Sequence, residues 1–274
     1  MARELLEVTV VYWAAAMAVC LMYKSSRTFQ LGVIPIAALA ILFVQTATGR
    51  LGTAGAAVVG VTVAGLIGAL SSRMYGWLAR ALSEDRRTPS LAIIELAVFS
   101  VYRACLGLAY GHRPLDERLY VHGSEEIALA LLGVLGIGAL LYTLTRSGFL
   151  SKLELGFWDP GFSCAQGWKQ LRIQHLSLTF GYALFAIAAI VQAGPGATQT
   201  RLEDLLDTYS VGLLTCFICG RNEIYIGPAA FIIAALEVVL LPKATIISTT
   251  LLPTVLFVLL LARGYCSKAS SKLY

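Results

Sequence analysis

Long apolar stretches, separated by short polar connections, occupy most of the chain. They cover residues 5–23, 31–48, 51–71, 89–110, 125–144, 176–193, 203–219, 225–241 and 244–262. A helix of about 20 apolar residues crosses a bilayer, and its backbone must be hydrogen-bonded internally because lipid offers no partners. The sequence lacks the alternating strands of a membrane barrel. The pattern therefore predicts an all-α, polytopic membrane helix bundle of about nine transmembrane helices, formed by a single domain, 1–274.

The stretch 203–219 is the weakest of these. Glu203, Asp204 and Asp207 lie in its first turns, and Gly212 interrupts it. It predicts either a full crossing or a half-helix that enters and leaves on the same side, which would leave eight crossings. With nine crossings and a cytoplasmic 145–175 segment, the inner side holds twice as many Lys and Arg residues as the outer side. Basic residues of short loops concentrate on the cytoplasmic side, so we expect an outside N-terminus.

Composition agrees with a membrane protein. The chain has 274 residues, of which 58% are hydrophobic and only 14% are charged, and its mean hydropathy is +0.76. Soluble domains carry about 25% charged residues. The six cysteines are too dilute for a disulfide scaffold, and the +5 charge is scattered, which excludes a nucleic-acid-binding face. The first stretch follows no basic cluster and precedes no cleavage site, so we expect it to remain in the mature protein.

Residues 146–175 form the only long hydrophilic segment. Asp159, Pro160 and Gly161 make a turn signal, and residues 165–173 are amphipathic. A simple connection between two crossings needs only a handful of residues. The segment predicts either a docking site for a partner or an interfacial helix anchored by aromatic residues such as Trp158 and Trp168.

Three ionisable residues lie inside predicted crossings: Glu95, Arg103 and Glu237. A charge at the bilayer centre costs about 2.5–3.5 kcal/mol on insertion scales, so such residues usually face a cavity or a partner. For Arg103 we favour a side chain that reaches the outer surface. Glu237 is the better candidate for a buried functional or structural carboxylate.

Motifs of enzymatic or metal chemistry are absent from the sequence. Cys216 and Cys219 have the spacing of a redox pair, but their surroundings are apolar and no second Cys/His pair follows. His112, His122 and His175 are too widely spaced to predict a metal site. The chain has no P-loop, no G-x-S-x-G and no H-E-x-x-H. We therefore expect neither an enzyme nor a bound cofactor or metal.

The glycines of 49–68 and 133–138 predict close helix packing.

Several segments, read in order, resemble the permease subunits of branched-chain amino-acid ABC importers. Residues 11–23 and 29–32 follow the family's opening pattern, with Gln30 near the place of its histidine. The remaining matches are 65–75, 89–94, the T-R-x-G of 145–148, the D-P of 159–160, the R-L-L-G-I-like 169–173, and 220–229, with Glu237 where family members often have a glutamate.

This resemblance implies a permease that pairs with a second, homologous or identical permease in a bacterial plasma (inner) membrane. Two ATP-binding subunits would lie below the pair and a solute-binding protein above it. The solute would be small and polar, a branched-chain amino acid or a related compound. The resemblance places coupling to the ATPase on one set of residues: Asp159, Pro160, Lys169, Leu171, Arg172 and Ile173. It leaves Gln30, Glu95 and Glu237 as candidates for lining the pathway.

Two alternatives remain open. The chain could be an ion-coupled transporter or channel that works alone, with Glu95 or Glu237 as the coupling carboxylate. It could also be a membrane scaffold that derives from the permease fold and moves no solute.

Overall fold

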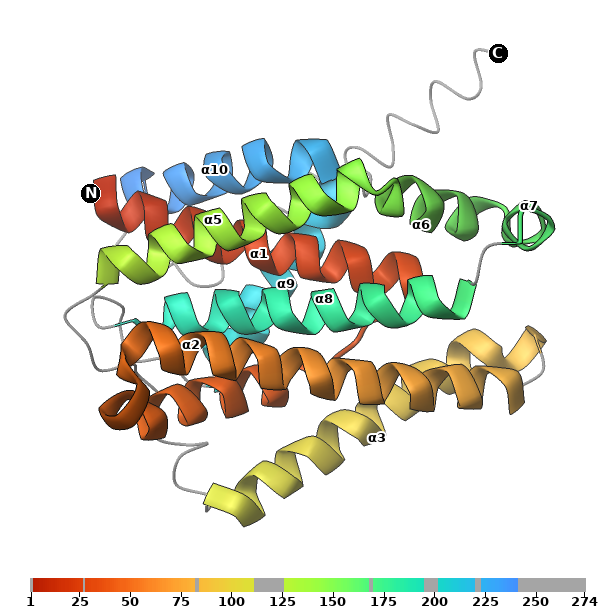
Figure 1. Cartoon of the computed structure of the whole chain (residues 1–274), viewed down its shortest axis with the longest axis horizontal. Coiled ribbons are helices and arrows are strands. Elements are labelled where there is room, and N and C mark those ends of the chain that lie inside the picture. Colours follow the sequence, from red (N-terminus) through yellow and green to blue (C-terminus); the bar gives the residue numbers. More distant parts are fainter. Residues whose placement is uncertain are drawn as a thin grey trace.

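The computed structural model describes residues 2–26, 28–81, 84–110, 126–167, 170–194, 202–219 and 223–240, and within these ranges every regular element is a helix. The helices are α1 (Ala2–Ser26), α2 (Val33–Ala81), α3 (Glu84–Tyr110), α5 (Glu126–Arg146), α6 (Phe149–Trp158), α7 (Pro160–Ala165), α8 (Gln170–Gln192), α9 (Leu202–Ile218) and α10 (Glu223–Leu240). The long helices lie roughly along one common direction (Figure 1).

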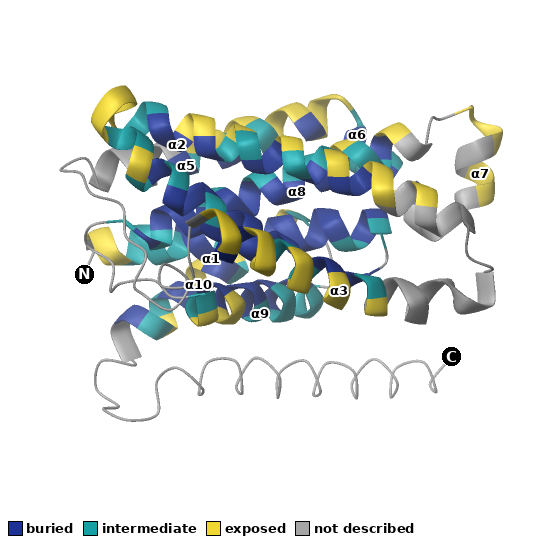
Figure 2. Ribbon diagram, turned by 90° about the horizontal axis from the view of Figure 1, so that it is seen from below, coloured by how far each residue is buried: buried dark blue, intermediate teal, exposed yellow. Residues whose placement is uncertain are grey.

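Helix α1 forms the centre of the bundle. Its residues from Ala14 to Met22 are all buried, and α8, α9, α10, α5 and α6 contact it. The run is rich in alanine, and small side chains let neighbouring helices approach closely. A Cβ placed on Gly212 of α9 would lie 2.9 Å from the carbonyl carbon of Ala15, and one on Gly181 of α8 would lie 3.2 Å from the carbonyl oxygen of Ala18. Figure 2 shows the buried residues concentrated along these helices.

Helix α2 is a hairpin. Gly52 has φ 70° and ψ 163°, a conformation that is open almost only to glycine. The two arms then run antiparallel, since a Cβ on Gly60 would lie 3.2 Å from the carbonyl oxygen of Ala40 and 3.3 Å from Val44 Cγ2. Each arm is close to the length that crosses a bilayer, which agrees with the separate stretches 31–48 and 51–71. The arm after Gly52 packs antiparallel against α8, and Ser72 Oγ lies 2.6 Å from His175 Nδ1.

The hydrophilic segment 146–175 is largely helical. Gly148, with φ 65°, ends α5 in the left-handed conformation, and the helix axis bends by 70° into α6. Helix α7 follows, and α8 begins at Gln170, several residues before the predicted start at 176. Leu171, Arg172 and Ile173 therefore belong to the first turns of α8 and not to a loop. Helices α6 and α7 extend beyond one end of the bundle, opposite the end where α2 turns (Figure 1).

The described helices include segments that are long and apolar enough to cross a membrane. Three helices meet both criteria, Arg3–Ser26, Val33–Met74 and Arg172–Gln192, and the bent pair Gly133–Arg146 and Phe149–Gly156 would be a fourth if it is one span. This finding is consistent with a membrane protein. The helical class is confirmed for the described residues, whereas the number of crossings stays a prediction. The stretch 244–262 lies outside the described residues.

The stretch 203–219, for which a half-helix was an alternative, is one continuous helix, α9. Glu203 and Asp204 lie in its first turn, where carboxylates interact favourably with the positive end of the helix dipole. These charges therefore suit the start of a helix and do not weaken it.

Candidate functional site

A short non-helical connection enters the interior of the bundle between α1 and α2. Residues 28–32 form it, and Gln30 and Gly32 are buried. A Cβ on Gly32 would lie 3.0 Å from Val98 Cγ1 of α3 and 3.4 Å from Tyr182 Oη of α8. The absence of a side chain at Gly32 thus lets the connection contact two helices at once.

The position of Tyr182 in α8 shows how far along the bundle this contact lies. It lies near the middle of Arg172–Gln192, one of the segments long enough to cross a membrane, and it is fully buried. Gly68 of α2 packs on it, since a Cβ there would be 2.8 Å from Tyr182 Cβ. The phenol is thereby held in a fixed position, with its hydroxyl directed to Gly32.

Polar groups from several helices gather around the Tyr182 hydroxyl. The carboxylate of Glu95 on α3 lies within electrostatic range of the hydroxyls of Tyr182 and Tyr209, the latter on α9. Tyr102, two turns after Glu95 and on the same face of α3, shares a 2.7 Å hydrogen bond with Ser71 of α2. We call Gln30, Glu95, Tyr182 and Tyr209, together with this Ser71–Tyr102 pair, the central polar cluster.

Two oxygen atoms of the central polar cluster have unmet hydrogen-bonding capacity. Gln30 Oε1 is buried and has no hydrogen-bond partner, although Gln30 Nε2 donates to Thr28 Oγ1 at 3.3 Å. Tyr182 Oη lies beside Ser71 but makes no hydrogen bond of good geometry with a described residue. Leaving a buried polar group without a hydrogen bond costs about 1–3 kcal/mol.

Glu95 is only 1% exposed. Helix α3 presents Glu95, Val98 and Tyr102 to the bundle at helical spacing, whereas Ile93 and Leu96 on its other side are exposed. Arg103 is also on the exposed side, which is compatible with the expected reach toward the surface.

Glu237, the third predicted pathway residue, is not part of this cluster. Its carboxylate accepts a hydrogen bond from Tyr12 Oη of α1. The structure thus buries Gln30 and Glu95 in the interior of the bundle and places Glu237 at a contact between α1 and α10.

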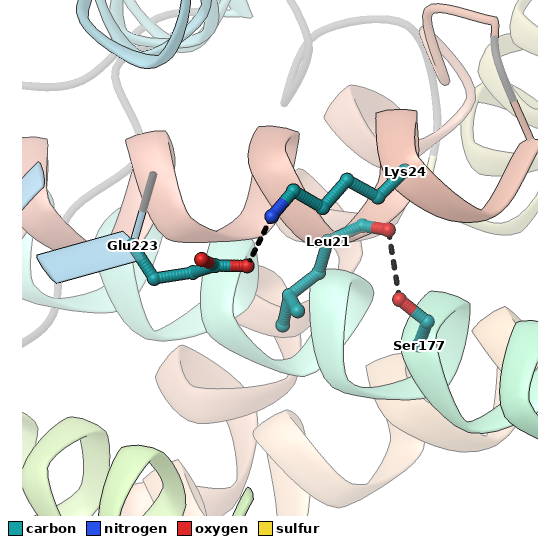
Figure 3. A network of polar contacts seen from close by, with 4 residues as sticks. All are labelled: Leu21, Lys24, Ser177 and Glu223. Carbon is teal, nitrogen blue, oxygen red and sulfur yellow. Dashed lines mark hydrogen bonds and ion pairs between the residues drawn. The ribbon is translucent and has the colours of Figure 1, made fainter. Parts of the chain in front are cut away.

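A second buried polar contact lies at the C-terminal end of α1. Lys24 Nζ and Glu223 Oε1 are 2.5 Å apart, and the two side chains are 3% and 11% exposed. Figure 3 shows this ion pair next to the hydrogen bond, 2.7 Å long, that Ser177 Oγ donates to the carbonyl oxygen of Leu21. This pairing could not be predicted from the sequence, because 199 residues separate the partners.

Sequence reasoning also missed Tyr182, Tyr209, Ser71 and Tyr102. A tyrosine or serine within an apolar run is usually a packing residue, and only the depth of Tyr182 and its contact with Gly32 distinguish it. One residue of the cluster nevertheless stands out in the sequence. Gln30 lies in the connection between two apolar stretches, where a buried amide is unexpected.

The predicted coupling residues fall into two structural settings. Asp159 ends α6 and caps α7, since Phe162 N donates to Asp159 Oδ1 at 2.9 Å, and Pro160 occupies the first helical position of α7, which suits its missing N–H. Arg172 is exposed and Ile173 is buried in the core. Lys169 lies outside the described residues, and Leu171 is described by its backbone alone.

Cysteines and histidines form no site in the described ranges. Cys216 is buried on α9 next to Cys20 of α1, Cys219 is half-buried, and none of the three belongs to a disulfide. No group of three or more His, Cys, Asp or Glu residues that could hold a metal ion occurs among the residues described. His112 and His122 fall outside these ranges.

Comparisons with protein-family models, with curated proteins and with solved structures find no match to this chain.

Proposed function

We propose that this protein is the membrane-spanning permease subunit of an ABC importer, which forms the pathway for a small polar solute. The observation that supports the proposal is the central polar cluster: Gln30, Glu95 and Tyr182 are all buried, and Tyr182 lies about halfway along a helix of membrane-spanning length. Burying such groups in an apolar bundle costs free energy, so they are retained for binding more readily than for stability.

The second support is the position of α6 and α7 at one end of the bundle (Figure 1). Two short helices follow the sharp bend at Gly148, and their exposed apolar side chains include Leu155 and Phe162. In this proposal they lie on the cytoplasmic side and receive the closing motion of a separate ATP-binding subunit. Rigid-body movement of the bundle would then expose the pathway to alternate sides.

The remaining elements of the proposal rest on the family resemblance. A second permease completes the pathway, two ATP-binding subunits hydrolyse ATP, and a solute-binding protein delivers the solute from outside. Branched-chain amino acids or related compounds are the proposed solutes, and the proposed location is the bacterial inner membrane.

Co-purification in mild detergent tests this function. The tagged chain is isolated, and ATPase activity is measured on the eluate. We expect ATPase activity with the native chain and its loss with Phe162→Asp on α7. The control is Leu51→Asp, which places the same charge at an exposed leucine near the Gly52 turn, at the opposite end of the bundle. A folded, monodisperse protein without ATPase activity would contradict the importer proposal, and equal loss in both variants would contradict docking on α7.

The burial of Glu95 also favours a second candidate, an ion-coupled transporter that acts without ATP. Its distinguishing measurement is uptake into vesicles that contain the purified chain alone and are energised by a cation gradient. Uptake under these conditions, abolished by Glu95→Gln, would select this candidate over the importer.

A further inference from the structure

Helices α1 and α9 pack closely and run parallel. A Cβ placed on Gly212 would lie 2.9 Å from the carbonyl carbon of Ala15 and 3.0 Å from the nitrogen of Ala16, so the two backbones approach each other directly. Farther along both helices, the rings of Tyr23 and Phe217 are in edge contact, with centroids 5.2 Å apart. The two contacts follow in the same order along each helix, and this order defines the parallel direction.

Two cysteines face each other between these contacts. Cys216 follows Gly212 by about one helical turn, and Cys20 follows Ala16 by the same distance. The thiols of Cys20 and Cys216 are joined by a hydrogen bond, both side chains are completely buried, and neither belongs to a disulfide. The C-x-x-C spacing draws attention to Cys219 as a redox partner of Cys216, whereas the folded chain places a third thiol against Cys216.

This arrangement suits a covalent bond between the two helices. A disulfide needs Cα atoms about 4.4–6.8 Å apart and Cβ atoms that point toward each other. The close approach of the α1 and α9 backbones favours the first requirement, and the hydrogen bond between the thiols favours the second.

The pair lies near one end of the bundle. Cys20 is six residues before Ser26, where α1 ends, which is about 9 Å at the rise of an α-helix. Cys219 follows the last residue of α9 and is only half-buried. Helix ends open locally at a lower free energy than the centre of a core does, so a small uncharged oxidant can reach the pair from this end.

We propose that Cys20 and Cys216 form an oxidant-sensitive pair, which a hydroperoxide converts into a disulfide between α1 and α9. One oxygen atom of hydrogen peroxide inserts into the S–H bond of Cys216, which gives a sulfenic acid, and the other oxygen leaves as water. The Cys20 sulfur then attacks the Cys216 sulfur, and the sulfenic hydroxyl leaves with the Cys20 proton as a second water. The bond holds α9 against α1, and its formation requires neither a solute nor an ATP-binding subunit.

Oxidation of the purified full chain in detergent with hydrogen peroxide tests the pair. Remaining thiols are alkylated before digestion, and the peptides are analysed by mass spectrometry. We expect one product that joins the Cys20 and Cys216 peptides, with the mass of both less two hydrogen atoms, and its disappearance on reduction with dithiothreitol. Because a cross-link constrains the unfolded chain, the unfolding temperature should rise on oxidation and return on reduction.

Two variants and a matched control locate the bond. Cys216→Ser and Cys20→Ala each remove one partner from a different helix, and both should abolish the joined peptide and the rise in unfolding temperature. Cys219→Ser removes the neighbouring thiol at the end of α9 and should retain both effects. If one of the two partner variants does not fold, the other decides the outcome.

Absence of the joined peptide after oxidation of the native chain would overturn the proposal. A bond between Cys216 and Cys219 in its place would do the same, as would an undiminished rise in unfolding temperature in Cys216→Ser. These readouts are independent of the co-purified ATPase. A chain that forms the bond without recruiting an ATPase loses the importer function but keeps the redox pair, and the converse result removes only the pair.

Discussion

Lys24 of α1 and Glu223 of α10 form an ion pair whose charged atoms are 2.5 Å apart, with both side chains largely shielded from solvent. Lys24 lies in the last turn of α1 and Glu223 is the first residue of α10, so the pair joins the end of the central helix to the start of another. Each charge also lies at the helix end that its sign favours. The arrangement fixes α10 against α1 at one end of the bundle.

Removal of one partner of this pair should be strongly destabilising. Lys24→Met leaves the Glu223 carboxylate shielded without its cation, and loss of one member of a buried pair costs about 3–5 kcal/mol. We expect a markedly lower unfolding temperature in detergent. The double variant Lys24→Met with Glu223→Leu should recover most of the stability, because it removes both charges and adds apolar contacts.

The exposed pair Arg3–Glu7 is the matched control. Its atoms are 2.9 Å apart on one face of α1, but the side chains are 45% and 20% exposed. Pairs of this kind contribute about 0.2–1 kcal/mol, so Arg3→Ala should change the unfolding temperature little. Equal changes in unfolding temperature in Lys24→Met and Arg3→Ala would show that the buried pair stabilises the protein no more than the exposed pair does.

Helices were predictable in this chain because their signal is local. Apolar stretches of bilayer length specify helices wherever water is absent, and the turn at Gly52 separates two stretches that were expected to be distinct. The start of α8 at Gln170 was missed because its first turn is polar, and polar residues at a helix end resemble a connection.

The central polar cluster could be predicted only in part. Gln30 and Glu95 are conspicuous because an amide or a carboxylate is unusual among apolar residues. Tyr182 carries no such signal, and its role depends on Gly32, 150 positions earlier, which contacts it across the bundle. Glu237 carried the same signal as Glu95 yet pairs with Tyr12, since the sequence does not specify which helix faces a given side chain.

Gly212 should be intolerant of even a single added carbon atom. A Cβ there would lie 2.9 Å from the Ala15 carbonyl carbon and 3.0 Å from the Ala16 nitrogen, and these backbone atoms cannot rotate away. Gly212→Ala should therefore push α9 away from α1 and lower stability by about 1–3 kcal/mol, as overpacking of a filled interior does. Chemical unfolding followed by tryptophan fluorescence measures the change.

Gly136 of α5 provides the comparison, since no atom lies within 4 Å of a Cβ placed there. Gly136→Ala should be neutral or stabilising by up to about 1 kcal/mol, because alanine favours helix over glycine. Similar destabilisation at both positions would mean that the α1–α9 contact is looser than the structure indicates.

Gly52 should be required for the turn that divides α2. Its φ of 70° with ψ of 163° is strained for any residue with a side chain, at about 1–3 kcal/mol. We expect Gly52→Ala to lower the unfolding temperature, whereas Gly49→Ala, where a Cβ also meets nothing within 4 Å and the backbone is helical, should not. A tolerant Gly52 would indicate that the two arms of α2 do not need this sharp turn.

Asp159 should stabilise α7 by capping it. Its Oδ1 accepts a hydrogen bond from Phe162 N at 2.9 Å, and loss of such a cap costs about 0.5–2 kcal/mol. In Asp159→Ala we expect faster hydrogen exchange in α7, with exchange in α1 unchanged, because the lost hydrogen bond joins Asp159 to Phe162 within this segment. Asp159→Asn keeps an acceptor oxygen at the same place and should preserve most of the protection.

If α7 is the docking element proposed above, Asp159→Ala will also reduce the ATPase activity that co-purifies, whereas Asp159→Asn will retain it. Equal exchange rates in Asp159→Ala and the native chain would show that α7 does not depend on this cap.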